Sequence, residues 1–343
     1  MLGNFGRGVL LLYVGYQSLA YRGPIRLGTD IGQTDIDSDG SHGELVVSAD
    51  KTVSLVLGSG GARGLAHIGV IHWLEENGYR IQSISGCSMG ALIGGIYAAG
   101  KLDQYEEWVR SVTRRDIMAL LDLTWDKGGL VRGDKLIDTL IDLVGDVHLE
   151  DLPIHFTAVA TDLHTQKEVW INTGKLFDAI RASIAIPLLF TPFKYKGHVL
   201  VDGGVLNPVP IAPAFHDDTD LTLAVNLNAP VSEKAVLDEV PAEAEEASAS
   251  PIRDRINRFI QRWQQNMVDS RHGDWGAYEV AIQAFDTMQS SIARQKLAVY
   301  PPDKVIEVPR NACQLLEFNR AAEMIDLGYR MAEELLGVEQ EVR

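Results

Sequence analysis

The sequence predicts an α/β fold, a three-layer α/β/α sandwich whose central sheet is mostly parallel. Up to residue 230, short apolar runs rich in β-branched residues alternate with longer segments of helical spacing, which indicates strands joined by helices. The composition also supports this fold class. A chain of 343 residues with 46% hydrophobic and 23% charged residues is typical of a globular protein that buries a large core.

A glycine-rich loop follows the first predicted strand. The strand covers residues 52–57, the loop covers residues 58–64, and apolar residues at helical spacing then predict a helix that ends near residue 78. A strand, a glycine loop and a helix are also the layout of a dinucleotide-binding site. That layout needs three glycines at set positions and an acidic residue about 20 residues later, and this chain meets it only in part.

The glycines of this loop favour the binding of an anion by backbone amides. Gly58 and Gly60 meet two positions of the dinucleotide pattern, but Arg63 occupies the third. The consecutive Gly60 and Gly61 instead suit a nest of N–H groups that faces a negative charge. Arg63 either adds a positive charge beside this nest or is a solvated side chain in the first helical turn.

Residues 86–90 read Gly-Cys-Ser-Met-Gly and fit the G-x-S-x-G pattern of a nucleophile elbow. A predicted strand over residues 80–85 precedes the pattern, and a helix of small residues follows it. A serine on so sharp a turn points outward, while Gly86 and Gly90 tolerate the crowded backbone around it. Ser88 is therefore the candidate nucleophile, and the helix N-terminus behind it favours developing negative charge.

An aspartate at the end of a later predicted strand is the candidate base. Residues 196–201 predict that strand, and Asp202, Gly203 and Gly204 follow it directly. An acidic side chain followed by two glycines can approach another backbone closely, so this carboxylate is the best placed partner for Ser88. Asp-Gly is also a common turn sequence, and alone this motif would indicate only a turn.

In this order and spacing, the three motifs resemble those of the patatin-like phospholipase family, and most of all its bacterial branch related to neuropathy target esterase. Residues 158–163 and 180–187 add to the resemblance, which covers about residues 53–230 and, more weakly, residues 318–323. The family implies an α/β sandwich that hydrolyses acyl esters of lipids with a serine and an aspartate. It also implies that neither a metal ion nor a cofactor takes part.

Carried over by position, the resemblance implies a role for each motif residue. Ser88 is the nucleophile and Asp202 is the base. The oxyanion hole consists of Gly60, Gly61 and Arg63. The remaining motif residues are Gly58, Gly64, Gly86, Gly90, Gly203 and Gly204. The expected partner is a lipid or another acyl-ester substrate.

Two other functions fit parts of the sequence. A Ser-His-Asp hydrolase of the α/β-hydrolase type needs a histidine after the acid, either His216 or His272, and both lie in polar, loop-like sequence. His67 shares the apolar face of the helix after the glycine loop, which favours a core histidine or one that supports the loop. The second alternative is a catalytically silent regulator that binds a nucleotide or a lipid at the glycine loop.

The sequence predicts four parts. They are an N-terminal tail, residues 1–50, which is disordered or a weak targeting segment; a catalytic core, residues 51–230; an acidic linker or lid, residues 231–250; and a helical extension that packs on the core, residues 251–343. Within the extension we expect a strand over residues 299–308, broken by two prolines, and a terminal helix over residues 315–336. Both complete the same fold.

An amphipathic, basic stretch follows the acidic segment. Phe259 and Trp263 lie on its apolar stripe, which predicts either packing on the core or peripheral contact with a membrane beside the lipid site. The net charge of −16 opposes adsorption on anionic bilayers, so we expect any membrane contact to be local and apolar.

Cysteine usage and charge bound the location and the partners. Two cysteines imply no disulfide framework, which favours the cytoplasm. The apolar run at residues 9–14 is too short to span a membrane, and it fits a weak export signal as well as a misassigned start. The sequence has no Cys/His cluster with metal-ligand spacing and no basic pattern typical of a nucleic-acid partner. It does not determine the oligomeric state.

Overall fold

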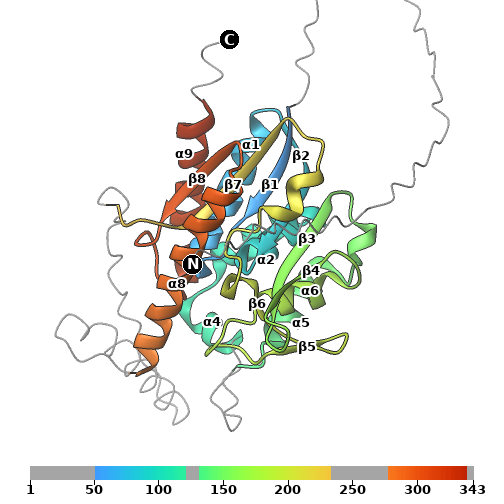
Figure 1. The fold of residues 1–343 in the computed structure, drawn as a ribbon, viewed down its shortest axis with the longest axis vertical. Helices are drawn as coiled ribbons and strands as arrows, with labels where there is room; N and C mark the ends of the chain where they lie inside the picture. The colour runs from blue at the N-terminus through green and yellow to red at the C-terminus, as the bar shows by residue number, and fades with distance from the viewer. Residues whose placement is uncertain (1–50, 121–130, 233–276, 338–343) are drawn as a thin grey trace, which may run out of the picture. The chain divides into compact units, whose positions relative to one another are not determined.

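The computed structural model describes residues 51–120, 131–232 and 277–337, all of which fall in one unit of the chain, Ala49–Arg343 (Figure 1). The predicted N-terminal tail, nearly all of the acidic segment and the amphipathic stretch with Phe259 and Trp263 lie outside the described residues. His272 also lies outside them.

Eight strands of the described chain form one sheet in the order β5-β6-β3-β2-β1-β7-β8, with β4 paired to β3 (Figure 1). The pairs β1–β2, β1–β7, β2–β3 and β7–β8 are parallel, whereas β3–β4, β3–β6 and β5–β6 are antiparallel. The strands are β1 (Lys51–Leu57), β2 (Tyr79–Cys87), β3 (His155–Asp162), β4 (Lys167–Ile171), β5 (Phe193–Tyr195), β6 (His198–Asp202), β7 (Leu221–Ala229) and β8 (Lys304–Pro309). The mostly parallel sheet predicted from the sequence is confirmed.

Helices connect the strands and cover the sheet. The α-helices are α1 (Ala66–Glu76), α2 (Met89–Ala98), α3 (Leu102–Ser111), α4 (Arg114–Leu120), α5 (Asp134–Val144), α6 (Leu176–Ser183), α8 (Ala277–Val299) and α9 (Ala321–Leu336). Short 3-10 turns are η1 (Gly61–Leu65), η2 (Leu149–Asp151), η3 (Gly203–Val205), η4 (Ala212–His216) and η7 (Phe318–Arg320).

Successive residues of the central strands face two separate cores. On β1, Leu55 and Leu57 belong to a large core that includes residues of α1, α2 and α9, whereas Val56 belongs to a smaller core. Ala293 of α8 and Ala214 of η4 line that smaller core. Because side chains alternate across a strand, helices therefore cover both faces, and the layers are those of the predicted α/β/α sandwich.

The C-terminal segment completes the same sheet, since β8 pairs with β7. The strand is shorter than the sequence indicates. Val299 still belongs to α8, and β8 begins only at Lys304. Pro301 and Pro302 lie between them and have no amide hydrogen to donate to a strand ladder, which explains the later start.

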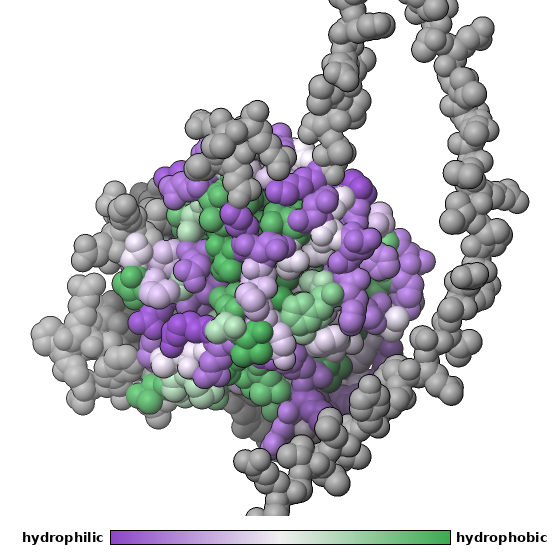
Figure 2. Space-filling model, turned by 45° about the horizontal axis from the view of Figure 1, so that its top comes forward, coloured by the Kyte–Doolittle hydropathy of each residue, from purple (hydrophilic) through white to green (hydrophobic). Residues whose placement is uncertain are grey.

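On the face shown in Figure 2, hydrophobic residues are interspersed with hydrophilic ones.

Helices α1 and α9 cross at two glycines that face each other's backbone. A Cβ atom on Gly69 of α1 would overlap the carbonyl oxygen of Ile325 and lie 2.6 Å from the amide nitrogen of Tyr329. A Cβ atom on Gly328 of α9 would overlap the carbonyl oxygen of Ala66. Ala66 directly follows η1, so this close crossing packs α9 against the base of the glycine loop.

We expect Gly69→Ala to lower the free energy of unfolding by at least about 2 kcal/mol, because the added methyl group meets backbone that cannot move aside. Gly337→Ala, at the end of α9, is the matched control. Gly337 has a helical φ of −65° and its nearest neighbour would lie 3.8 Å from the new Cβ, so we expect a change between zero and a gain of about 1 kcal/mol. Urea unfolding followed by circular dichroism measures both. Equal effects would contradict the close crossing.

Candidate active site

Ser88 lies in a strained turn between the end of β2 and the start of α2. Its φ of 54° and ψ of −122° are unusual for a residue with a side chain, and they aim the hydroxyl out of the turn. The Ser88 amide donates to Ser183 Oγ at 2.9 Å, and Ser183 Oγ donates to the Val159 carbonyl at 2.6 Å. The last residue of α6 therefore ties the turn to β3 and holds its unusual conformation.

The two glycines of the Ser88 turn are required by close backbone contacts. A Cβ atom on Gly90 would overlap the carbonyl oxygen of Leu57 at the end of β1. A Cβ atom on Gly86 would lie 2.5 Å from the carbonyl oxygen of Gly90. A side chain at Gly90 would push α2 away from β1, and one at Gly86 would push α2 away from β2, so the turn requires glycine at both positions.

The strand register brings Asp202 to the same end of the sheet as Ser88. Cys87, the last residue of β2, lies opposite Val159 of β3. Asp202, the last residue of β6, lies opposite Ala160, the next residue of β3. Two residues far apart in the sequence thus become neighbours through the strand between them.

The two carboxylate oxygens of Asp202 differ in their surroundings. Oδ1 accepts the Gly204 amide at 2.7 Å and the Cys87 thiol at 3.7 Å. Oδ2 is buried and makes no hydrogen bond of standard geometry. A buried acceptor without a partner is costly, and such atoms occur where a structure keeps a lone pair free for chemistry.

Burial makes Asp202 a stronger base than an ordinary aspartate. Loss of solvation raises the pKa of Asp202 to about 6, while hydrogen-bonding interactions with the Ser88 side chain, the Gly204 amide and the Cys87 thiol act to lower it. Since Oδ2 lacks a bond of standard geometry, the Ser88 interaction is a looser one. Burial and the nearby Asp202 also raise the pKa of the Cys87 thiol, which therefore stays protonated as a donor.

The glycine loop lies beside the Ser88 turn. Its Ser59 and Ala62 amides donate to the carbonyls of Pro208 and Leu315 at 2.8 and 2.9 Å. Within the part of the chain that the structure describes, no acceptor outside their own helical turn takes the amides of Gly60 and Gly61. Gly61 has a left-handed φ of 55° and lines the same pocket as Ser88.

Arg63 is buried, so the solvated side chain that the sequence allowed is wrong. Its guanidinium donates to the Gly60 carbonyl at 3.2 Å and to the Arg310 carbonyl at 2.7 Å. It also forms an ion pair with Asp286 of α8 at 3.0 Å. The side chain therefore ties the glycine loop to two distant segments. Of the other motif glycines, Gly58 and Gly203 face the backbone carbonyls of Val225 and Val159. A Cβ on Gly64 would overlap the Met89 side chain, and one on Gly204 would overlap the Gln289 side chain.

No histidine of the described residues hydrogen-bonds Ser88 or Asp202. Burial lowers the pKa of His67 to about 4, so this ring is neutral, and its Nε2 lies 2.9 Å from the Gly58 carbonyl. His67 therefore supports the glycine loop, one of the two roles predicted for it. His216 is an exposed residue at the end of η4.

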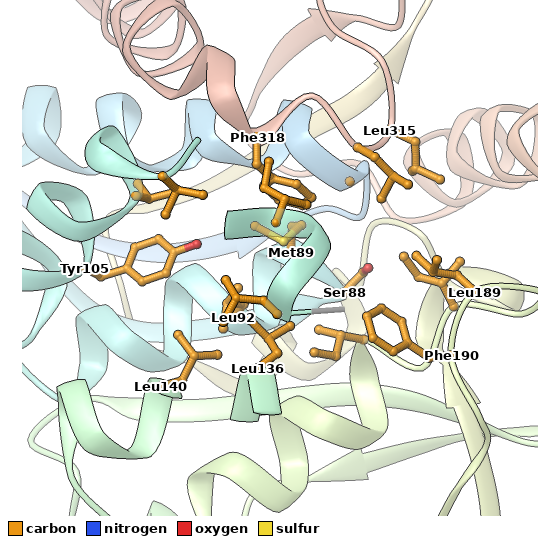
Figure 3. Close-up of a pocket in the computed structure, with 18 of the residues that line it drawn as sticks. Ser88, Met89, Leu92, Tyr105, Leu136, Leu140, Leu189, Phe190, Leu315 and Phe318 are labelled. Carbon is orange, nitrogen blue, oxygen red and sulfur yellow. The ribbon is translucent and has the colours of Figure 1, made fainter. Parts of the chain in front are cut away.

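Ser88 opens onto an apolar pocket with about 760 Å³ of empty space, its open side included (Figure 3). Its walls come from α2, α3, α4 and α5, from the segment after α6 and from the connection between β8 and α9. Leu92, Leu136, Leu140, Phe190 and Phe318 are among the side chains that point into it. A concave site lined mainly by apolar and aromatic side chains is typical of small-molecule sites.

One face of α8 contacts the site, which the sequence analysis missed. Besides the Asp286–Arg63 pair, Gln289 Oε1 accepts the Ser59 hydroxyl at 3.3 Å, and Lys296 pairs with Glu168 of β4 at 2.7 Å. The three α8 residues are three and seven positions apart and therefore share a helix face. The spacing of these three polar residues in the sequence could have indicated a shared helix face, but nothing in the sequence indicated which residues they would contact.

The chain is similar to known proteins over most of its length. The family model "Patatin-like phospholipase" matches residues 55–215. An uncharacterized NTE family protein of Mycobacterium tuberculosis is 40% identical over 332 residues, which cover 84% of this chain and 92% of that protein. A protein of Pyricularia oryzae named Lysophospholipase NTE1 is 26% identical over 295 residues, which cover 83% of this chain and 18% of that protein. The crystal structure of VipD from Legionella pneumophila aligns with 84% of this chain and 67% of that chain, with a TM-score of 0.44 and 17% identity.

The described residues were also compared with what a membrane span and a metal site require. None of their helices has both the length and the apolar character that crossing a bilayer requires. Nor do three of their His, Cys, Asp or Glu side chains gather where they could hold a metal ion.

The raised pKa of Asp202 predicts a pH-dependent effect of Asp202→Asn on stability. Below about pH 4 the acid is protonated in both folded and unfolded chains, whereas above pH 6 the folded chain must keep a buried carboxylate. We therefore expect Asp202→Asn to be more stable than wild type at pH 8, by roughly 3 kcal/mol at most, with the difference shrinking towards pH 5. Urea unfolding at both pH values measures it.

Asp162→Asn is the control for this experiment. Hydrogen bonds from His198, Thr165 and the His164 amide hold the pKa of Asp162 below its usual value, so its carboxylate stabilises the folded chain at neutral pH. We expect this variant to be less stable than wild type at pH 8. A destabilised Asp202→Asn with no pH dependence would contradict the buried, high-pKa carboxylate.

Proposed function

The chain belongs to the NTE family of patatin-like phospholipases, and on that premise we propose that it is a serine acyl hydrolase that cleaves ester bonds of lipids. One observation carries the proposal. The Asp202 carboxylate is buried and interacts with the Ser88 side chain, and Ser88 is held on a strained turn that opens onto an apolar pocket. This arrangement supports Ser88 as the nucleophile, Asp202 as the base and the pocket as the place for an acyl chain.

In the proposed mechanism, Ser88 Oγ attacks the ester carbonyl carbon while its proton passes to Asp202 Oδ2. The tetrahedral intermediate then collapses, the bond to the alcohol oxygen breaks, and the alcohol leaves with the proton from Asp202. Water then attacks the acyl-serine carbonyl carbon and gives one proton to Asp202. The bond to Ser88 Oγ breaks, Oγ takes that proton from Asp202, and the fatty acid is released. A base with a pKa of about 6 is largely ionised at pH 7 and still basic enough to assist a hydroxyl.

We propose that the amides of Gly60 and Gly61 donate to the oxyanion of the tetrahedral intermediate. Their lack of partners outside the helical turn and the place of Gly61 beside Ser88 in the pocket wall support this role. Arg63 adds positive charge to the loop and keeps its shape through Gly60 and Asp286. Loss of one such donor costs roughly 10²–10³ in rate in serine hydrolases, so the loop matters about as much as the base.

The apolar pocket supports a long-chain acyl group as the part of the substrate that is buried. The name of the Pyricularia oryzae relative supports lysophospholipids as the first candidates. Peripheral membrane contact through Phe259 and Trp263 and a cytoplasmic location remain predictions, and those two residues lie outside the described chain.

The experiment that tests the proposal is labelling with a fluorophosphonate, together with hydrolysis of lysophosphatidylcholine. We expect wild type to be labelled and active, and Ser88→Ala to show neither property. Asp202→Asn should lose about 10²–10⁴ in kcat, the usual contribution of a general base. His216→Ala is the control and should behave as wild type. If His216→Ala, still folded, lost labelling while Asp202→Asn kept it, a Ser-His-Asp enzyme would replace this proposal.

The pH dependence of kcat/KM should report the Asp202 carboxyl. Because the base must be ionised, we expect the rate to fall about tenfold per unit below a midpoint near pH 6 and to level off above it. Cys87→Ala removes a donor that lowers the Asp202 pKa, so its midpoint should move to higher pH. An unchanged midpoint in Cys87→Ala, or one that moves in His216→Ala, would argue against Asp202 as the base.

A further inference from the structure

The Tyr105 side chain brings a hydroxyl to the apolar pocket. Tyr105 lies on α3, lines the pocket and is only 2% exposed. Figure 3 shows its ring at one end of the pocket, with the hydroxyl pointing inward on the side of Met89. Among the residues that the structure describes, none hydrogen-bonds this hydroxyl, and burial alone raises the pKa of Tyr105 well above its usual value. The group therefore stays protonated at any physiological pH.

A hydroxyl that faces an apolar pocket and has no hydrogen-bond partner among the described residues needs a reason. The Tyr105 ring packs against Trp108, with 5.6 Å between the ring centroids, and phenylalanine would provide that packing equally well. The oxygen adds only a desolvation cost unless something in the pocket binds it. Since the hydroxyl points into the space that a ligand would fill, a ligand atom is the natural partner.

The chemistry of the pocket restricts what that atom is. Among the described residues that line the pocket, only Ser88, Tyr105 and Trp108 have a side chain with an O–H or N–H group, and none is charged. A carboxylate, phosphate or ammonium group would therefore be desolvated there without a counter-charge. A neutral oxygen fits, because it can accept from or donate to a phenol hydroxyl.

We propose that Tyr105 is a specificity subsite that selects acyl chains carrying a neutral oxygen function, a hydroxyl, keto or epoxide group, part way along the chain. This inference rests on the proposed function, which fixes the ester carbonyl at Ser88. Because Ser88, in the turn before α2, and Tyr105, on α3, line one pocket, the carbon that reaches Tyr105 is set by the protein. The preference should therefore depend on the position of the oxygen.

The test is a positional series of substrates. Umbelliferyl octadecanoate and its mono-hydroxylated isomers, with the hydroxyl moved carbon by carbon, are compared by kcat/KM in wild type, Tyr105→Phe and Trp108→Phe. We expect wild type to favour one isomer, or two adjacent isomers, over the plain chain by roughly threefold to tenfold, as one neutral hydrogen bond provides. Tyr105→Phe should abolish that preference, so that its kcat/KM is the same for every isomer and for the plain chain. Trp108→Phe should keep the preference.

A second readout separates this inference from the proposed function. Titration calorimetry with Ser88→Ala measures binding of the preferred isomer and the plain ester without turnover, and Ser88→Ala combined with Tyr105→Phe should bind the two equally. A flat series in wild type, or a preference that survives Tyr105→Phe, would overturn the subsite while leaving the hydrolase intact. Selective binding through Tyr105 without any hydrolysis in wild type would instead overturn the proposed function alone.

Discussion

The burial of the Asp202 carboxylate beside Ser88 is the constraint on which the rest of the site depends. The sheet places both residues at one end through β3, which has Val159 opposite Cys87 and Ala160 opposite Asp202. Burial raises the pKa of the Asp202 carboxyl to about 6, although its hydrogen-bond neighbours act to lower it. The same burial leaves Oδ2 without a hydrogen bond of standard geometry, while the carboxyl group interacts with the Ser88 side chain.

The surrounding structure holds this arrangement by backbone contacts more than by side chains. The turn at Ser88 has a positive φ, and the contact of Gly90 with the Leu57 carbonyl presses it against β1. The neutral ring of His67 supports the glycine loop through its contact with the Gly58 carbonyl. Helix α8 also holds the loop in place through the ion pair between Asp286 and Arg63. A segment beyond the part matched by the family model thus helps to shape the candidate site.

The sequence predicted the layers of the fold and the positions of its main turns because those features are local. Apolar periodicity identified β1 and β7, and the glycines around Ser88 indicated a turn that only glycine permits. The long-range contacts could not be predicted from the sequence. Arg63 has the same local pattern whether it is solvated or buried, and only the positions of Arg310 and Asp286 decide between the two.

The polar residues of α8 and the hydroxyl of Tyr105 were missed for a similar reason. A helix with Gln289 and Lys296 on one face reads as an ordinary solvated helix until Ser59 and Glu168 are placed opposite. A tyrosine on an apolar stripe reads as core. What distinguishes Tyr105 is the pocket in front of its hydroxyl, and that pocket is made by side chains of several separate segments.

The pKa of Asp202 itself tests the central claim most directly. Carbon-13 labelling of aspartate carboxyl groups, with Asp202→Asn to assign the signal, gives that pKa by nuclear magnetic resonance. This account predicts a value near 6 in the wild-type protein and a higher one in Ser88→Ala, since the serine side chain stabilises the ionised form. A value near 4 that does not respond to Ser88→Ala would contradict it, because the carboxylate would then be neither desolvated nor coupled to the serine.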